Sequence, residues 1–172
     1  MSLIKYVYSV AIILSLFPIA SVNSESLLSK KIISFAPKEL PITKVRDLQG
    51  HEVALQTLKD QPTIIHFWAT WCPSCRNELS SFQSFCASSK NIRGVLISED
   101  FKPEMIAPFL TENKITLTSY HDLKGQFMAA MKIRGLPTTV FLNKAGKEIG
   151  RLEGPIDWND GGIKDFLEKL SA

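Results

Sequence analysis

Cysteine and histidine are both scarce in this sequence, with three of each: Cys72, Cys75, Cys86, His51, His66 and His121. Three cysteines cannot form the disulfide framework that is typical of small secreted domains. The histidines do not fall at zinc-ligand spacing from one another or from the cysteines, so we expect no metal site. One close cysteine pair with one cysteine left over is instead the pattern of a redox-active domain with a core cysteine.

The sequence also has no block of basic residues, although its net charge is +3. Its aromatic residues are not interleaved with lysine and arginine runs, which argues against nucleic acid binding. Internal repeats and low-complexity tracts are absent as well. With 172 residues and 45% hydrophobic composition, the chain can bury one core, and we expect one globular domain. Nothing in the sequence demands more than a monomer.

Charge is nearly absent from the N-terminal segment, where Lys5 is the only charged residue before Glu25. A basic start, an apolar stretch and then small residues are typical of a secretory signal peptide, here with cleavage after Ser24. The alternative is an uncleaved membrane anchor, because residues 6–24 are uncharged and a bilayer-spanning helix needs about 20 apolar residues. No cysteine lies near Ala20, which excludes a lipid-modified N-terminus. Both interpretations deliver the domain outside the cytoplasm.

We expect three parts in the chain: residues 1–24 are the signal peptide or N-terminal membrane anchor, 25–38 a short exposed connector, and 39–172 the folded domain. Hydrophobic periodicity predicts the elements of that domain. The predicted strands are residues 63–67, 95–97, 115–120, 138–142 and 147–152. The predicted helices are residues 73–89, 103–110 and 126–131, and a closing helix with Ile163, Phe166, Leu167 and Leu170. This order predicts an α/β fold with a mixed central β-sheet flanked by helices on both faces.

The most informative motif is Trp71-Cys72-Pro73-Ser74-Cys75, which directly follows an apolar predicted strand. Pro73 suits the first turn of a helix, so the motif lies where a buried strand is followed by a helix. A helix N-terminus presents free N–H groups and partial positive charge, and both stabilise a thiolate. A cysteine in this position is expected to attack disulfides faster than an ordinary thiol. The motif therefore predicts a dithiol–disulfide exchange site.

With its elements in this order, the sequence resembles the thioredoxin fold and, more closely, the TlpA/ResA-like exported thiol–disulfide oxidoreductases. The resemblance covers residues 39–172 and is carried by four segments. These are Phe67 to Glu78 (FWATWCPSCRNE), Gly135 to Thr139 (GLPTT), Asn143 to Gly146 (NKAG) and Gly154 to Trp158 (GPIDW). Each segment is weak alone, but their order and spacing together are specific. The resemblance implies a thioredoxin-like fold and no cofactor beyond a redox-active Cys72–Cys75 disulfide.

The resemblance also assigns roles to individual residues. It makes Cys72 the exposed attacking thiolate and Cys75 the buried resolving thiol, the order that the helix dipole favours. Pro137 falls on the family's cis-proline, so Leu136 would lie beside the cysteines with its backbone free to pair with an extended substrate segment. We therefore expect Trp71, Leu136 and Pro137 to bind the substrate.

Two further residues each have a functional and a structural interpretation. Glu78 matches a glutamate near the family's active site and could exchange a proton with Cys75, or it could complement the helix dipole as a first-turn glutamate. His66 stands where cytoplasmic thioredoxins carry an aspartate and many exported relatives an asparagine. It could act as the base for Cys75, or it could be a core histidine satisfied by one backbone hydrogen bond.

The remaining cysteine points to neither a second disulfide nor a peroxidase. Cys86 lies about three helical turns after Cys75, roughly 16 Å along the axis, so the two cannot bond and Cys86 is predicted to be a small core residue. A peroxidase site needs threonine or serine three residues before the reactive cysteine. Ala69, Cys72 and Gln83 occupy those positions, which excludes that activity.

The expected function is that of an exported thiol–disulfide oxidoreductase, in the periplasm or at the outer face of the inner membrane. By resemblance, its substrates are oxidised cysteines of exported proteins, for instance haem-binding Cys-x-x-Cys-His motifs during cytochrome c maturation. Its electrons would come from a membrane thiol reductase. Pro73, directly after the first cysteine, favours the opposite, disulfide-forming direction of DsbA-like proteins. A thioredoxin-fold binding module without turnover is the third alternative.

Overall fold

The computed structural model describes residues 32–89, 91–163 and 166–167. The predicted signal peptide or anchor and the predicted helical residue Leu170 lie outside these ranges. Within them, no helix is both long and apolar enough to cross a membrane.

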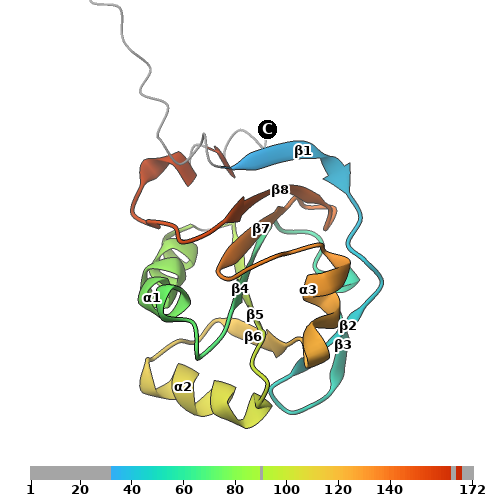
Figure 1. Cartoon of the computed structure of the whole chain (residues 1–172). Helices are drawn as coiled ribbons and strands as arrows, with labels where there is room; N and C mark the ends of the chain where they lie inside the picture. Colours follow the sequence, from blue (N-terminus) through green and yellow to red (C-terminus); the bar gives the residue numbers. More distant parts are fainter. Residues whose placement is uncertain (1–31, 90, 164–165, 168–172) are drawn as a thin grey trace, which may run out of the picture.

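One mixed sheet of eight strands forms the centre of the described part of the chain (Figure 1). The strands are β1 (Ile33–Lys38), β2 (Lys44–Asp47), β3 (Glu52–Ala54), β4 (Thr63–Trp68), β5 (Arg93–Ser98), β6 (Thr118–His121), β7 (Thr138–Leu142) and β8 (Glu148–Glu153). The helices are α1 (Pro73–Ser88), α2 (Ile106–Glu112) and α3 (Gln126–Ala130), with the 3-10 helices η1 (Leu55–Thr57), η2 (Pro103–Met105) and η3 (Leu123–Gly125). Residues 161–163 and 166–167 are also helical.

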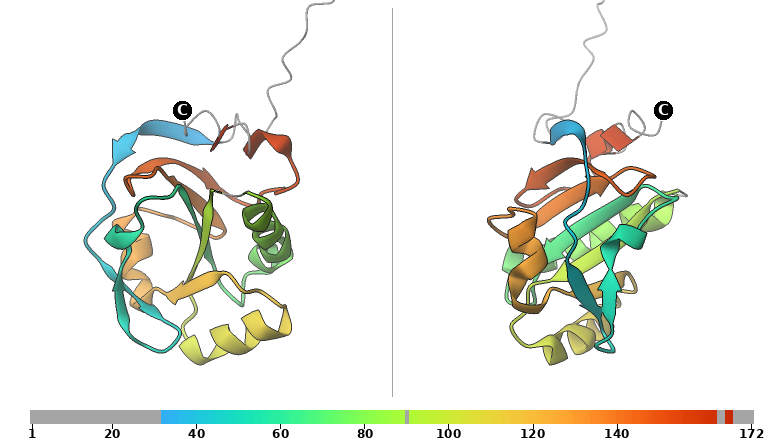
Figure 2. Two further views of the ribbon diagram at one scale, coloured as in Figure 1. Left: turned by 180° about the vertical axis from the view of Figure 1, so that it is seen from behind. Right: turned by 90° about the vertical axis from the view of Figure 1, so that its right-hand side faces the viewer.

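The strand order is β1-β8-β7-β4-β5-β6-β2-β3, in which β4, β5 and β6 run parallel and the other neighbours pair antiparallel. Helices α1 and α2 cover one face of the sheet and α3 covers the other (Figure 1 and Figure 2). Strand β4 shows why both faces are covered. Ile64 and Trp68 belong to one apolar cluster, and Ile65 and Phe67 to the other, as alternation along a strand requires. The predicted fold class is confirmed.

The N-terminal end of the domain differs from the predicted connector at residues 25–38. Residues Ile33–Lys38 form β1, an edge strand that pairs antiparallel with β8 and places Ile33 opposite Arg151. Gly150 permits this close pairing, because a Cβ at that position would lie 3.1 Å from the carbonyl oxygen of Ile33. Most residues of β1 are exposed, so its sequence shows no buried apolar pattern. The strand depends on backbone pairing with a distant segment, which the local sequence does not reveal.

Two other boundaries differ from the prediction by a few residues. Strand β6 begins at Thr118 rather than at residue 115, because the N–H of Ile115 donates to the carbonyl of Leu110 and completes the end of the preceding helix. The helix predicted from Pro103 starts as the 3-10 turn η2 and becomes α-helical only at Ile106.

One face of α1 is buried against the sheet and carries the residues Cys75, Glu78, Leu79, Phe82 and Cys86. Cys86 is a free, buried cysteine, as predicted for a small core residue. It faces Gly94 of β5, where a Cβ would come within 2.6 Å of Cys86 Sγ. Helix and sheet therefore approach each other closely only because residue 94 is glycine. Burial raises the pKa of the Cys86 thiol to about 12, so this sulfur is no nucleophile in the folded protein.

Candidate active site

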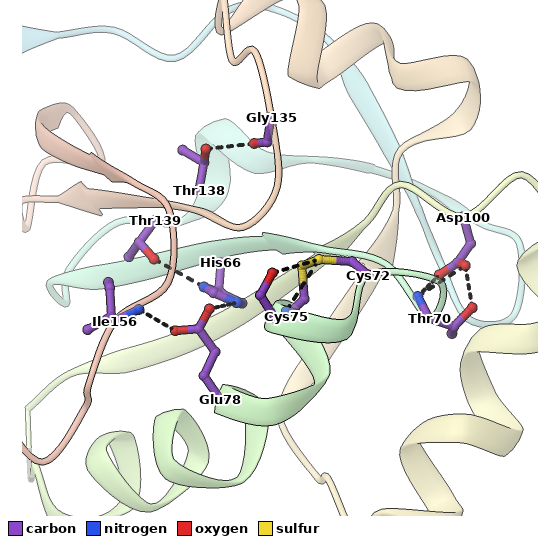
Figure 3. Close-up of a disulfide and its surroundings, with 11 residues drawn as sticks. His66, Thr70, Cys72, Cys75, Glu78, Asp100, Gly135, Thr138, Thr139 and Ile156 are labelled. Atoms are coloured by element: carbon purple, nitrogen blue, oxygen red, sulfur yellow. Dashed lines mark hydrogen bonds and ion pairs between the residues drawn. A yellow bond between two sulfur atoms is a disulfide. The ribbon is translucent and has the colours of Figure 1, made fainter.

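Cys72 and Cys75 form a disulfide at the point where β4 is followed by α1 (Figure 3). Cys72 is the N-cap residue of α1, and Pro73 occupies the first helical position. The N–H of Cys75 donates a hydrogen bond to Cys72 Sγ at 3.3 Å. One of the free N–H groups of the helix N-terminus is thus directed at this sulfur. A thiolate on Cys72 would receive the same hydrogen bond and the positive end of the helix dipole.

The disulfide is accessible from one side only. Cys75 is fully buried, as predicted, whereas Cys72 is 5% exposed and therefore less open than predicted. The physical reason is that the bond draws the sulfur of Cys72 toward Cys75, and both belong to the same apolar cluster. The neighbouring Trp71 is 55% exposed. The residue that directly precedes Cys72 therefore presents an exposed indole ring.

Asp100 holds the loop that leads into the disulfide, and sequence reasoning missed this residue. Its carboxylate accepts hydrogen bonds from the Thr70 N–H at 3.0 Å, the Thr70 hydroxyl at 2.6 Å and the Ser98 hydroxyl at 2.7 Å. Thr70 and Asp100 each stand two residues after the end of a strand, and the last residues of β4 and β5 pair in parallel. That common offset from two adjacent parallel strands is the signal that could have found the contact.

The peptide bond between Leu136 and Pro137 is cis, as the resemblance implied. Its loop is held by the Thr138 hydroxyl, which donates to the Gly135 carbonyl at 2.8 Å, and by the Gly154 N–H, which donates to the Pro137 carbonyl at 2.9 Å. Among the described residues, the backbone N–H and C=O of Leu136 find no hydrogen-bond partner. These two groups are therefore open to an extended segment of another molecule.

An open cleft of about 750 Å³ reaches from the Leu136 loop to the indole of Trp71. Phe101, which is 92% exposed, stacks on Trp71 with 6.5 Å between ring centroids. The cleft also contains the acidic residues Glu99, Asp100 and Asp122. Burial, and next the negative charge of Asp122, raise the pKa of Glu99 to about 9, so Glu99 is neutral at pH 7. The cleft therefore combines an aromatic rim with less negative charge than its composition suggests.

Glu78 of α1 and His66 of β4 meet on the buried side of the disulfide (Figure 3). Glu78 Oε2 accepts hydrogen bonds from the N–H of Ile156 at 2.9 Å and from Nε1 of Trp158 at 3.1 Å. The other oxygen, Oε1, lies 3.7 Å from His66 Nε2. His66 Nδ1 in turn lies 3.1 Å from the hydroxyl of Thr139 on β7. The two candidate residues thus form one buried cluster with partners from two other segments, strand β7 and the segment after β8.

Comparison with known proteins identifies this arrangement. The AhpC/TSA family model matches residues 36–147, more than half of the chain. The chain belongs to the AhpC/TSA family. A relative named sporulation thiol-disulfide oxidoreductase A, from Bacillus subtilis, is 32% identical over 130 residues that cover 73% of this chain and 77% of the relative. Thiol-disulfide oxidoreductase ResA from Bacillus thuringiensis is 23% identical over 136 residues that cover 78% of each chain.

A solved structure shares the fold of this AhpC/TSA protein. It is that of a secreted Mycobacterium tuberculosis disulfide oxidoreductase homologous to E. coli DsbE, with a TM-score of 0.63 and 19% identity over 73% of this chain and 96% of that chain. The family match and the curated relatives confirm the predicted resemblance and make this chain a thiol–disulfide oxidoreductase.

Burial decides the charges of Glu78 and His66 in this family member. Burial lowers the pKa of His66 to about 3, so the imidazole is neutral at physiological pH. Burial raises the pKa of Glu78 to about 7, although the hydrogen bonds from Ile156 and Trp158 oppose the rise. Glu78 therefore changes its charge near neutral pH, which is the property that a proton-exchanging group needs.

The structure contradicts the dipole interpretation of Glu78, and it shows His66 as a buried core histidine whose partner differs from the expected one. Helix α1 begins at Pro73 and has no acidic residue in its first turn, so Glu78 is not a dipole-complementing glutamate at the helix start. Its carboxylate instead binds two N–H donors of the segment that follows β8. His66 is paired with the side chain of Thr139 rather than with a backbone group. The structure does not by itself assign either residue a catalytic role.

The Glu78→Gln variant should lose a pH-dependent part of the stability of the disulfide form. The folded pKa of about 7 lies above the ordinary value of 4.5 for a glutamate, so the folded protein binds this proton more readily than the unfolded chain. The resulting stabilisation is present below pH 4.5 and is lost as the pH rises through 7, by about 3 kcal/mol in all. Urea unfolding of both proteins between pH 4 and 8 measures the difference.

The wild-type protein should lose its advantage over Glu78→Gln steadily across this window. His66 acts in the opposite sense in both proteins, because its lowered pKa gives stability that is lost as the pH falls below about 6.5. A constant stability difference between the two proteins from pH 4 to 8 would show that Glu78 does not titrate in this range.

Proposed function

We propose that this protein is an exported thiol–disulfide oxidoreductase that reduces disulfides in exported proteins through a Cys72/Cys75 dithiol–disulfide cycle. The observation that carries the proposal is the position of Cys72 Sγ. It lies at the N-terminus of α1 and receives the N–H of Cys75, and the preceding residue, Trp71, carries an exposed indole at the rim of an open cleft. This is the arrangement that favours a thiolate able to meet a protein substrate.

In the first step, the Cys72 thiolate attacks one sulfur of the client's disulfide. The client's S–S bond breaks, a bond forms between Cys72 and the client, and the other client cysteine leaves as a thiolate. The helix N-terminus lowers the energy of the attacking thiolate.

In the second step, the Cys75 thiol gives its proton to the Glu78 carboxylate and attacks Cys72 Sγ. The Cys72–Cys75 disulfide forms, and the second client cysteine leaves as a thiolate, so two electrons pass from the cysteine pair to the client. Cys75 and Glu78 are three residues apart on α1 and therefore share one face of the helix. With its pKa near 7, Glu78 can accept this proton and return it to solvent.

The client is expected to bind as an extended segment along the loop of Leu136 and Pro137. The open N–H and C=O of Leu136 can pair with its backbone. The rings of Trp71 and Phe101 offer an apolar surface for a side chain close to the client's cysteine.

The proposal of export is supported by the N-terminal sequence and by a secreted protein of the same fold. The N-terminal pattern of one lysine and an uncharged run favours a signal peptide or anchor. A secreted disulfide oxidoreductase has the same fold. We propose that the protein works in the periplasm or at the outer face of the inner membrane and receives electrons from a membrane thiol reductase. Oxidised Cys-x-x-Cys-His motifs during cytochrome c maturation are the proposed clients.

The reduction potential of the Cys72/Cys75 pair tests the direction of electron flow. The protein is equilibrated in dithiothreitol and glutathione buffers, and Trp fluorescence reports its state. We expect a value near or below about −250 mV, which suits a reductant that depends on a membrane donor. The Cys86→Ala variant should give the same value, because the buried thiol takes no part.

A potential near about −120 mV would make the protein a disulfide donor, the direction that Pro73 favours. The absence of a reversible two-electron transition would leave a binding module without turnover. Trapping a client on Cys72 in cells, with the Cys75→Ser protein, then identifies which exported cysteines are bound.

A further inference from the structure

We propose that the hydroxyl of Thr139 fixes the tautomer of His66, so that His66 Nε2–H faces Glu78 and holds it as the carboxylate that deprotonates Cys75. This inference rests on the proposed function only for the step at Cys75. The arrangement of protons itself can be measured without any substrate. Thr139 and His66 are positioning residues in this scheme, because they act through Glu78.

The first support is geometric. His66 and Thr139 are directly opposite each other in the antiparallel pair of β4 and β7. Both are fully buried, and the hydroxyl of Thr139 lies 3.1 Å from His66 Nδ1. On the other side of the ring, Nε2 lies 3.7 Å from Glu78 Oε1. In the described part of the chain neither of these two atoms has a hydrogen-bond partner, so each can serve the other after a small rotation of the carboxylate.

The tautomer follows from the needs of the hydroxyl group. A neutral imidazole carries one N–H donor and one acceptor nitrogen. If Nδ1–H donated to Thr139, the hydroxyl hydrogen of Thr139 would be buried without an acceptor, since His66 Nδ1 is the sole partner of this hydroxyl among the described residues. A buried, unsatisfied donor is costly. The satisfied arrangement has Thr139 donating to Nδ1, which leaves the N–H on Nε2, directed at Glu78.

The electrostatic surroundings keep the ring neutral. His66 lies against the rings of Phe82 and Trp158, with 5.3 Å and 6.2 Å between centroids. The titratable groups that face Glu78 in the described residues are His66 from β4 and, after reduction, Cys75 from its own helix. The segment after β8 contributes only the N–H donors of Ile156 and Trp158. The proton released by Cys75 therefore rests on Glu78 and not on the imidazole.

The consequence is a specific role for the Nε2–H group. A hydrogen bond donated to a carboxylate favours its ionised form, so Nε2–H opposes the effect of burial on Glu78. Without it, a smaller share of Glu78 would be ionised at neutral pH, and fewer molecules could accept the proton of Cys75. The imidazole of His66 thus helps to keep a buried carboxylate in the form that acts as a base.

Nitrogen NMR of the full-length protein with isotope-labelled histidine tests the tautomer directly. We expect the His66 signals, assigned by their loss in His66→Phe, to show a proton on Nε2 and none on Nδ1 at neutral pH. In Thr139→Val the preference should weaken or reverse, and Thr139→Ser, which keeps the hydroxyl, should restore it. A proton on Nδ1 in the wild-type protein, or a cationic ring, would overturn the proposal.

The pH profile of the second exchange step tests the consequence for Glu78. The reduced protein is mixed with a symmetrical aromatic disulfide, and release of the second coloured thiolate reports attack by Cys75 on the mixed disulfide. We expect the midpoint of this step to rise by about one pH unit in His66→Phe and Thr139→Val, and to stay unchanged in Thr139→Ser. Release of the first thiolate, which depends on Cys72, should not shift.

The two measurements separate the possible failures. Equal midpoints in the wild-type and Thr139→Val proteins would overturn the role of the tautomer even if the protein exchanges disulfides normally. If the wild-type protein does not release the first coloured thiolate at all, that result would instead contradict the proposed function. If Thr139→Val does not fold, the wild-type spectrum and the His66→Phe profile still decide the matter, because a proton on Nδ1 or an unshifted midpoint in His66→Phe would overturn the proposal.

Discussion

We expect the Cys72→Ser protein to lose disulfide exchange almost completely, with turnover in an insulin reduction assay falling by at least about 1000-fold. The reason is geometric. Cys72 Sγ alone receives the N–H of Cys75 at the helix N-terminus and reaches the surface, whereas Cys75 is fully buried behind it. A client disulfide therefore has access to one attacking sulfur.

The Cys75→Ser protein should fail in a different way. Cys72 can still attack, but no thiol remains to displace the client, so a covalent complex accumulates. Non-reducing electrophoresis should show this complex with Cys75→Ser and not with Cys72→Ser. Cys86→Ser is the matched control and should turn over like the wild-type protein. A complex formed by Cys72→Ser, or loss of turnover in Cys86→Ser, would contradict the assignment of Cys72 as the attacking cysteine.

The second large effect concerns stability. Phe82→Ala should lower the free energy of unfolding of the disulfide form by about 3–5 kcal/mol. Phe82 is fully buried, and its ring packs against Trp158 at 4.5 Å and His66 at 5.3 Å between centroids. Removing the ring leaves a cavity between helix α1 and the sheet. This cavity cannot close by a further approach of the helix, because α1 and the sheet already touch at Gly94.

Urea unfolding measures this change, with Phe101→Ala as the control. Phe101 is 92% exposed, so its truncation should change the stability by no more than about 0.5 kcal/mol. Phe82→Ala should also disturb Glu78, because Trp158 both contacts Phe82 and donates to the carboxylate. A loss below about 1 kcal/mol in Phe82→Ala would show that α1 can repack over the sheet.

The sequence predicted those features of the site that are local in the chain. The strand, the proline at the first helical position and the two cysteines lie within residues 63–75, so their geometry follows from short-range rules. The resemblance supplied the cis bond at Pro137. The fold class followed from the alternation of elements, because each strand and helix carries its own apolar period.

The sequence could not predict the contacts that join distant segments. Thr139 stands 73 residues after His66, and Ile156 stands 78 residues after Glu78. These two contacts depend on the register between β4 and β7 and on the path of the chain after β8. No local sequence pattern predicts either of these features. Glu78 and His66 were each recognised as candidates, but their proximity emerges only when the helix packs on the sheet. Strand β1 escaped notice for a related reason, since its stability comes from a partner more than 100 residues away.

The packing of Cys86 against Gly94 has a consequence for an oxidising environment. Three cysteines allow three single-disulfide isomers, yet only the Cys72–Cys75 isomer is compatible with a folded α1, because Cys86 lies against the sheet with its sulfur facing a glycine. The Cys86 thiol therefore does not react with oxidants or alkylating reagents for as long as the domain stays folded. The rate at which Cys86 is modified therefore reports how often the whole domain unfolds. This readout is independent of the chemistry at the active-site pair.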